Sequence, residues 1–163
     1  MNMLGAVISK LTGVGGSPRR LHKVTTTPSS PRKNRKVIDR YLRRMGKNAN
    51  QDLSLDSRGV CYIPFRKFLV IVDVPDDDGG QCSIYTKVFD MRRVQNKARI
   101  NTILNELNSL QLPTGGATLS LDEDEVYLFH SAPIEGLKFK DMVETVEAFL
   151  RMAVDINANL SLR

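Results

Sequence analysis

Residues 60–74 read VCYIPFRKFLVIVDV, and this stretch decides the fold. It is rich in β-branched and aromatic residues, and Arg66 divides it into two short apolar runs. Runs of this length and composition are typical of β-strands rather than helices. We interpret them as two neighbouring antiparallel strands, 60–65 and 67–74. The second is almost wholly apolar, which predicts a central strand that is covered on both faces.

The strand pattern continues outward from this pair in both directions. Toward the N-terminus, Leu53 and Leu55 alternate with polar residues and residues 56–59 form a turn signal, so 53–55 is expected as a strand. Toward the C-terminus, residues 75–80 predict a loop and residues 83–89 alternate as a further strand. The sequence therefore predicts an antiparallel meander over residues 52–90.

Three amphipathic helices are predicted around these strands. The first covers 35–46, with Asn34 as its cap and Gly46 as its stop, and the others cover about 97–111 and 137–159. Between the last two, residues 117–121 and 126–130 predict a hairpin. The fold class is therefore α+β, an antiparallel sheet of five to six strands with helices packed on it, in the order α-β-β-β(-β)-α-β-β-α.

The formal net charge of +6 is unevenly spread. Residues 1–38 hold eight of the 24 basic residues and no acidic residue, and the remaining 125 residues carry a net charge of −2. We expect residues 1–34 to be a disordered basic tail or transit segment, and 35–163 to be the folded domain. Because the body is slightly acidic, nucleic-acid binding by the folded domain is not expected.

Two interpretations of the tail remain open. Leu4, Val7, Ile8 and Leu11 share a helix face beside basic residues, as in an organelle transit peptide. Alternatively, the tail is retained in the cytoplasm and regulated by phosphorylation, which would cancel part of its charge. The candidate phosphorylation sites each precede a proline, and they are Ser17, Thr27 and Ser30. Both interpretations suggest a eukaryotic protein.

The sequence contains no convincing catalytic or metal-binding constellation. Cys61 and Cys82 are expected as reduced core thiols, although either one with His130 would supply a nucleophile and a base. That alternative predicts a reactive thiol of low pKa. The acidic runs 76–78 and 122–125 lack the ligand spacing of a calcium loop. We therefore expect no enzyme, no cofactor and no metal, and no apolar stretch of about 18 residues suggests a membrane span.

Several local patterns, taken in order, resemble the Tir chaperone (CesT-like) family of type III secretion chaperones. These are LSLDSRGVC at 53–61, VIVDVP at 70–75, LNELN at 104–108 and GATLSLD at 116–122, followed by a closing helix with Phe149 and Leu150. The resemblance spans roughly residues 37–160. It implies a non-catalytic homodimer that holds an extended segment of a client protein.

The resemblance also implies two sets of site residues. The dimer interface would come from the second helix and the strand after it, at Ile100, Ile103, Leu104, Leu107 and Leu119. The client would contact the first helix and early strands, at Ile38, Tyr41, Leu42, Met45, Leu53, Leu55 and Ile63. Extended clients of this kind gain main-chain hydrogen bonds and side-chain pockets.

The basic tail departs from the family pattern and supports an alternative function. In that hypothesis the protein is a regulatory adaptor, and its phosphorylatable tail binds acidic surfaces or nucleic acid. Binding would then depend steeply on salt and would require the tail.

Overall fold

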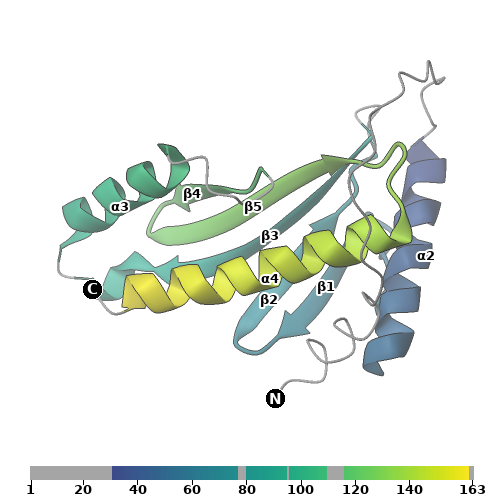
Figure 1. Ribbon diagram of the computed structural model, residues 1–163, viewed down its shortest axis with the longest axis horizontal. Coiled ribbons are helices and arrows are strands. Elements are labelled where there is room, and N and C mark those ends of the chain that lie inside the picture. The colour runs from purple at the N-terminus through teal and green to yellow at the C-terminus, as the bar shows by residue number, and fades with distance from the viewer. Residues whose placement is uncertain (1–30, 77–79, 95, 110–115, 162–163) are drawn as a thin grey trace, which may run out of the picture.

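The computed structural model describes residues 31–76, 80–94, 96–109 and 116–161. Its elements follow the predicted order of helices and strands (Figure 1). They are α2 (Pro31–Ala49), β1 (Val60–Phe65), β2 (Phe68–Asp73), β3 (Gln81–Asp90), the short 3₁₀ helix η1 (Met91–Arg93), α3 (Lys97–Ser109), β4 (Thr118–Asp122), β5 (Glu125–Pro133) and α4 (Phe139–Ser161). The predicted α+β class and antiparallel sheet are confirmed.

The five strands form one antiparallel sheet in the order β1-β2-β3-β5-β4. The long strands β3 and β5 pair along most of their length, so the chain segments before and after α3 meet at the centre of the sheet. Residues 53–55, expected as a strand, lie outside the sheet. There the Leu55 N–H donates to Asp39 Oδ1 of α2 at 2.9 Å, which ties this segment to the helix.

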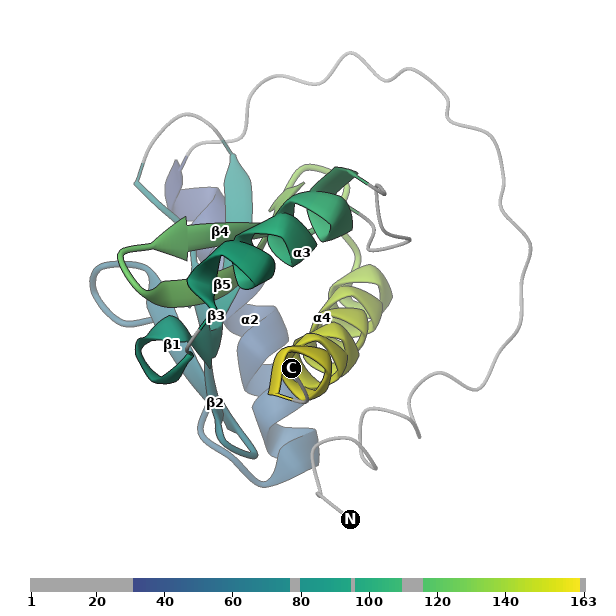
Figure 2. The same cartoon turned by 90° about the vertical axis from the view of Figure 1, so that its left-hand side faces the viewer.

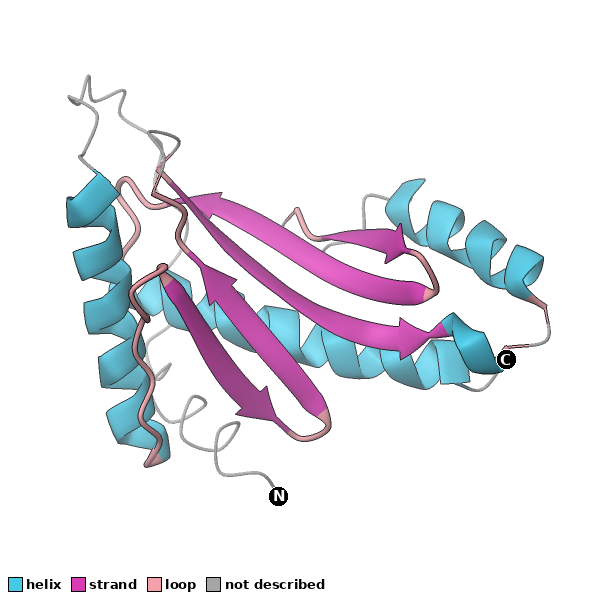
Figure 3. Cartoon of the chain, turned by 180° about the vertical axis from the view of Figure 1, so that it is seen from behind, coloured by secondary structure: helices cyan, strands magenta, loops and turns pink. Residues whose placement is uncertain are grey.

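The two faces of the sheet have different surroundings. Helix α4 runs along one face, and α2 packs at one end (Figure 1). Viewed from the α3 end, α4 lies on one side of the sheet (Figure 2). Seen from behind, none of the described helices lies over the opposite face (Figure 3). Alternate strand residues point toward the helices and form the core, including Ile63, Val70, Val72 and Ile84.

The expectation for the second strand was therefore wrong. β2 is an inner strand between β1 and β3, as expected, but the described helices cover only one of its faces. Phe68, Val70 and Val72 are buried, whereas the Leu69 side chain is half exposed. An apolar run does not by itself require cover on both faces, because the helices available here cover only one.

Helix α2 begins at Pro31 and ends at Ala49, so it is longer than the predicted 35–46. Asn34, expected as the cap, lies inside the helix and is buried. Gly46, expected as the stop, also lies inside. A β-carbon there would come within 2.4 Å of the Gln51 carbonyl oxygen, so the glycine permits the chain to turn back closely against the helix.

The early start of α2 changes the charge assignment. Arg32 and Lys33, which were expected in the tail, stand on this helix together with Arg35 and Lys36, which the predicted helix already included. Arg35 is anchored to the fold, since its guanidinium donates to the carbonyls of Val74 at 2.9 Å and Arg58 at 2.7 Å. The basic character of the protein is therefore shared between the tail and a structured helix.

Helix α3 lies at the far end of the sheet, beside the edge strand β4 (Figure 1). The Asn108 side chain joins the two elements. Its amide donates to the Leu119 carbonyl and its oxygen accepts from the Leu119 N–H, both at 2.8 Å. These backbone groups lie on the outer edge of the sheet, so α3 occupies part of the position that an added strand would take.

Candidate functional site

The sheet face without a helix carries a continuous set of large side chains, which we call the open face. Its members come from four strands: Tyr62, Pro64, Leu69, Ile71, Tyr85, Tyr127 and Phe129. Tyr62 stands opposite Ile71, Ile71 opposite Tyr85, and Tyr85 opposite Phe129, so one row crosses the sheet. Tyr62 is 46% exposed, Leu69 51% and Phe129 38%. An exposed apolar set of this extent is typical of an interaction surface.

Part of the open face is hollowed where β3, β5 and β4 meet. The hollow has a volume of about 430 Å³ and is lined by Tyr85, Ser120, Asp122, Tyr127 and Phe129. The rings of Tyr85 and Phe129 stack with their centres 6.5 Å apart. The hollow thus combines aromatic walls with polar groups, which suits a side chain from a partner.

Two tyrosine hydroxyls on this face, those of Tyr85 and Tyr127, have raised pKa values and remain protonated at neutral pH. The Tyr127 hydroxyl donates to Glu125 Oε2 at 2.7 Å, and this hydrogen bond to a carboxylate, followed by burial, raises its pKa to about 12. Burial also raises the pKa of Tyr85. The two phenols therefore contribute apolar area and neutral hydrogen-bonding groups rather than charge.

Most of the residues expected to contact a client are buried within the single chain. Ile38, Leu42, Met45, Leu53 and Ile63 belong to the core. The other two members, Tyr41 and Leu55, are partly exposed and pack against the core from its border. Tyr41 is held by its hydroxyl, which donates to the Leu137 carbonyl at 3.0 Å.

The residues expected at a dimer interface divide in a similar way. Ile100 and Leu104 of α3 and Leu119 of β4 are buried within the chain. Ile103 and Leu107 are partly exposed on α3. Leu121, which was not predicted, is 43% exposed on the same edge strand. Among the described residues, the larger accessible apolar side chains of α3 and β4 are therefore Ile103, Leu107 and Leu121.

The two cysteines are free and buried, as expected for core thiols. Burial raises the pKa of Cys61 to about 11 and that of Cys82 to about 12, which opposes the low pKa that a catalytic thiol needs. Burial also lowers the pKa of His130. The geometry gives no support to a cysteine nucleophile activated by this histidine.

No cluster of three or more metal-ligating side chains occurs within residues 31–76, 80–94, 96–109 and 116–161. No helix in this part of the chain is long and apolar enough to cross a bilayer. The expected phosphorylation sites Ser17, Thr27 and Ser30, and the segment with transit-peptide character, lie outside the described residues.

Sequence reasoning missed the open face, although the sequence holds a signal for it. Leu69 is out of phase with Phe68, Val70 and Val72, which share the buried face, and Tyr62 is out of phase with Cys61 and Ile63. Strict alternation along each strand would have separated the two faces. It would not have identified which face the helices cover.

Comparisons with known proteins agree on the architecture. The model of the Tir chaperone protein (CesT) family matches residues 40–157. The structure of the ExsC–ExsE complex is similar at a TM-score of 0.64 and 17% identity, covering 72% of this chain and 89% of that chain. No match was found among curated proteins.

Two further solved structures share the fold. The HopA1–SchA chaperone–effector complex matches at a TM-score of 0.61 and 16% identity, covering 76% of this chain and 94% of that chain. The Yersinia pestis type III secretion chaperone SycH, solved with a stable fragment of YscM2, matches at a TM-score of 0.53 and 13% identity. The match covers 72% of this chain and 97% of that chain. At these identities the likeness concerns the fold.

Proposed function

The chain belongs to the Tir chaperone protein (CesT) family, and from that membership we propose that it is a dimeric chaperone that holds an extended segment of a client protein. The family is one of non-catalytic secretion chaperones. The solved relatives include a chaperone–effector complex and a chaperone bound to a fragment of another protein. The function proposed here is of the same kind: to bind a segment and keep it unfolded.

The observation that carries this proposal is the open face. Its half-exposed residues Tyr62, Leu69 and Phe129 lie on a sheet whose other face already supplies the core. Covering such side chains gains roughly 25 cal/mol for each Å² of apolar area removed from water. A client segment that lies across these strands would supply that cover without any change in the core.

Two of the client residues expected from the family resemblance remain partly accessible. Tyr41 lies on α2 against Phe139 of α4, and Leu55 lies in the segment after α2; in this proposal both contact the client directly. The remaining five are buried in the core, on α2, on β1 and in the segment between them. The client would therefore touch the open face and the border of α2.

Dimerisation is proposed through the end of the sheet that carries α3 and β4. Ile103, Leu107 and Leu121 expose apolar area there, and α3 stands apart from the helices that cover the core (Figure 1). A two-fold contact would place the same side chains of two copies against one another.

Light scattering on the full chain tests the dimer. The monomer mass is 18.3 kDa, and we expect twice that value for the wild type and the monomer value for Ile103→Asp/Leu107→Asp. Leu104→Asp is unsuitable, because Leu104 is buried and a charge there would unfold the domain. Asn101→Asp/Asn105→Asp adds the same charges at exposed positions of α3 and should remain a dimer. A monomeric wild type would contradict this part of the proposal.

Fluorescence anisotropy with labelled peptides tests client binding. A panel of extended peptides rich in β-branched and aromatic residues is titrated with the full chain. We expect Tyr62→Asp/Leu69→Asp to weaken the best binder about tenfold or more, because it places two charges on the open face. The variant Asn101→Asp/Asn105→Asp again serves as the charge-matched control. If no peptide of any composition binds, the chaperone function is wrong.

A further inference from the structure

Helix α2 concentrates the positive charge of the folded part of the chain. It carries eight basic residues and one acidic residue, Asp39. Residues 50–163, by contrast, hold twelve basic and 17 acidic residues. A basic helix on an otherwise acidic body is an uneven distribution that dimerisation and core packing do not explain.

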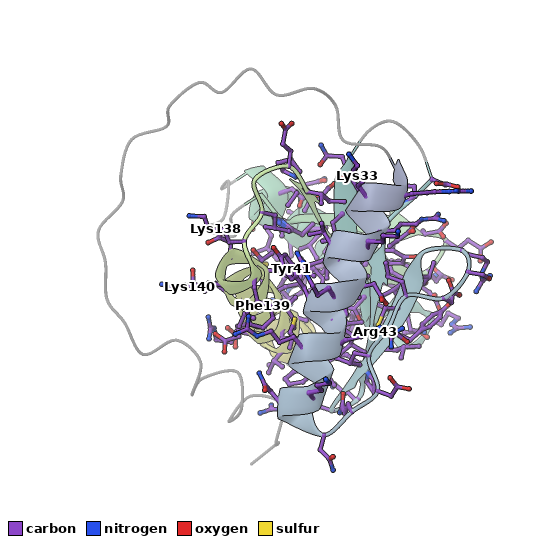
Figure 4. All side chains as sticks on the ribbon, turned by 90° about the vertical axis from the view of Figure 1, so that its right-hand side faces the viewer. Lys33, Tyr41, Arg43, Lys138, Phe139 and Lys140 are labelled. Atoms are coloured by element: carbon purple, nitrogen blue, oxygen red, sulfur yellow. The ribbon has the colours of Figure 1, made fainter. Side chains whose placement is uncertain are left out.

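Part of this charge surrounds an aromatic pair where α2 meets the start of α4. We call this surface the α2–α4 patch, and its residues are Lys33, Arg40, Tyr41, Arg44, Lys138, Phe139 and Lys140. Figure 4 shows Tyr41 and Phe139 in the seam between the helices, with Lys33 on α2 and Lys138 and Lys140 on the side of α4. The rings of Tyr41 and Phe139 meet edge to face, with centres 5.7 Å apart.

The cations of the patch are mostly available to a partner. Lys33, Arg40, Arg44 and Lys138 are exposed and form no ion pair within the described part of the chain. Lys140 pairs with Glu144 at 3.5 Å, and the Asp141 carboxylate accepts the Lys138 backbone N–H at 3.2 Å. The local charge therefore remains positive after the neighbouring carboxylates are counted.

Two contacts fix the patch in place. The Arg44 guanidinium lies 4.1 Å from the centre of the Phe139 ring, and that of Arg40 lies 5.6 Å from the centre of the Tyr41 ring. Such cation–π contacts orient the arginines while their outer N–H groups stay free to donate. A partner would therefore meet cations that are already positioned, which lowers the entropy cost of binding.

The chemistry of the patch favours an acidic polypeptide. Single-stranded nucleic acid is bound by stacking bases on open ring faces, but Phe139 is covered by Arg44 and Tyr41 lies edge to face against Phe139. A protein surface that binds a membrane needs large apolar side chains that point outward into the lipid. The half-exposed large apolar residues of the described chain lie on the strands, and none lies on α2 or α4.

From these observations we propose that the α2–α4 patch selects clients whose bound segment carries acidic residues beside an apolar one. This inference rests on the proposed chaperone function and specifies its client class. Carboxylates of the segment would pair with Lys33, Arg40 and Arg44, and the apolar residue would cover the seam of Tyr41 and Phe139.

The helix geometry sets the length of the recognised segment. Lys33 and Arg44 are eleven positions apart, which is about 16 Å along an α-helix. An extended peptide rises about 3.3 Å per residue, so roughly five residues span this distance, and alternate side chains face the same way. The segment is therefore expected to carry two or three carboxylates at alternate positions.

Anisotropy titrations of the full chain test the selectivity. The probe is a labelled peptide of about twelve residues with glutamate at three alternate positions among valine and leucine, and its counterpart carries glutamine instead. We expect the glutamate peptide to bind about tenfold more tightly at low salt, and added NaCl to remove most of the difference.

Charge reversal on the patch should abolish this preference. Arg40→Glu/Arg44→Glu is expected to weaken the glutamate peptide about tenfold or more while leaving the glutamine peptide within about twofold. Arg99→Glu/Arg151→Glu makes the same change of net charge at exposed positions of α3 and α4, and should keep the preference. Circular dichroism melts establish that each variant is folded.

Each other outcome overturns the inference in a distinguishable way. Equal binding of the two peptides, or equal loss in both double variants, would reject the acidic selectivity and leave the chaperone function standing. Tighter binding of a thymidine oligonucleotide or of phosphatidylserine vesicles than of the glutamate peptide would assign the patch to that partner instead. Failure of both peptides and of the wider panel would reject the chaperone function itself.

Discussion

The two faces of the sheet are built from the same five strands, but one forms the core and the other is exposed. The face toward α4 and α2 is filled by buried side chains such as Ile63, Val72 and Ile84. The open face presents Tyr62, Leu69 and Phe129 to solvent. One covered face therefore supplies the core of this domain, and the other face is available for binding. Four experiments test this difference between the faces, from the largest expected effect to the smallest.

The largest expected difference is in thiol reactivity. Cys61 and Cys82 point to the covered face, and burial raises the pKa values of their thiols to about 11 and about 12. Because thiolate is the reacting species, we expect them to react roughly a hundredfold to a thousandfold more slowly than an ordinary thiol of pKa about 8.5.

The matched comparison is a cysteine placed on the open face. Ser120→Cys adds a thiol at an exposed position of β4, and native labelling at pH 8 should modify this thiol first. Rapid labelling of the wild type would show that the covered face is not closed.

Next in size is the loss of stability from truncating neighbouring residues of β1. Ile63 is fully buried, and Ile63→Ala should cost about 2–5 kcal/mol of unfolding free energy. Tyr62→Ala, on the open face, should change it by no more than about 0.5 kcal/mol. Urea unfolding measures both values. Similar losses for the two variants would mean that the open face also contributes to the core.

A smaller loss of unfolding free energy is expected at the edge strand β4, which borders both faces of the sheet. Asn108→Ala removes both hydrogen bonds to the Leu119 backbone and should cost about 1–3 kcal/mol. Asn105→Ala removes an exposed amide from the same helix and should be close to neutral. Chemical denaturation compares them, and equal stability of the two variants would show that α3 does not depend on this contact.

The smallest effect is a pH dependence that comes from His130 on the covered face. Burial lowers its pKa below the usual 6.5, and a hydrogen bond with the Gly116 backbone opposes part of this shift. The unfolded chain therefore binds a proton that the folded chain does not, so stability falls as the pH drops below about 6.5.

The carboxylates whose pKa values are lowered titrate below pH 5, but burial raises the pKa of Glu147. The contribution of the histidine is therefore the difference between the wild-type profile of unfolding free energy from pH 5 to pH 7.5 and that of a variant that lacks only this side chain. His130→Gln should flatten the profile relative to the wild type. An unchanged slope would assign the dependence to another group.

The order and type of the main elements, and most of the core, could be predicted from the sequence. Strand alternation at 60–65 and 83–89 and the helical stripes near 100 and 146 reflect local geometry, in which side chains repeat every two or every 3.6 residues. The family patterns at 53–61 and 116–122 then ordered these elements into one known fold. The early strand at 53–55 and the cover expected over β2 were wrong.

The start of α2, the open face and the patch beside Phe139 depend on contacts between distant parts of the chain, and the sequence did not predict them. Alternation shows that a strand has two faces, but the position of distant helices decides which one is covered. Likewise, Lys33 belongs to a helix rather than a tail, because α2 begins at Pro31, and Arg35 in the first turns of this helix bonds to Val74, 39 positions away. Contacts between distant residues overrule local signals, since the free energy of packing is larger than that of local propensity.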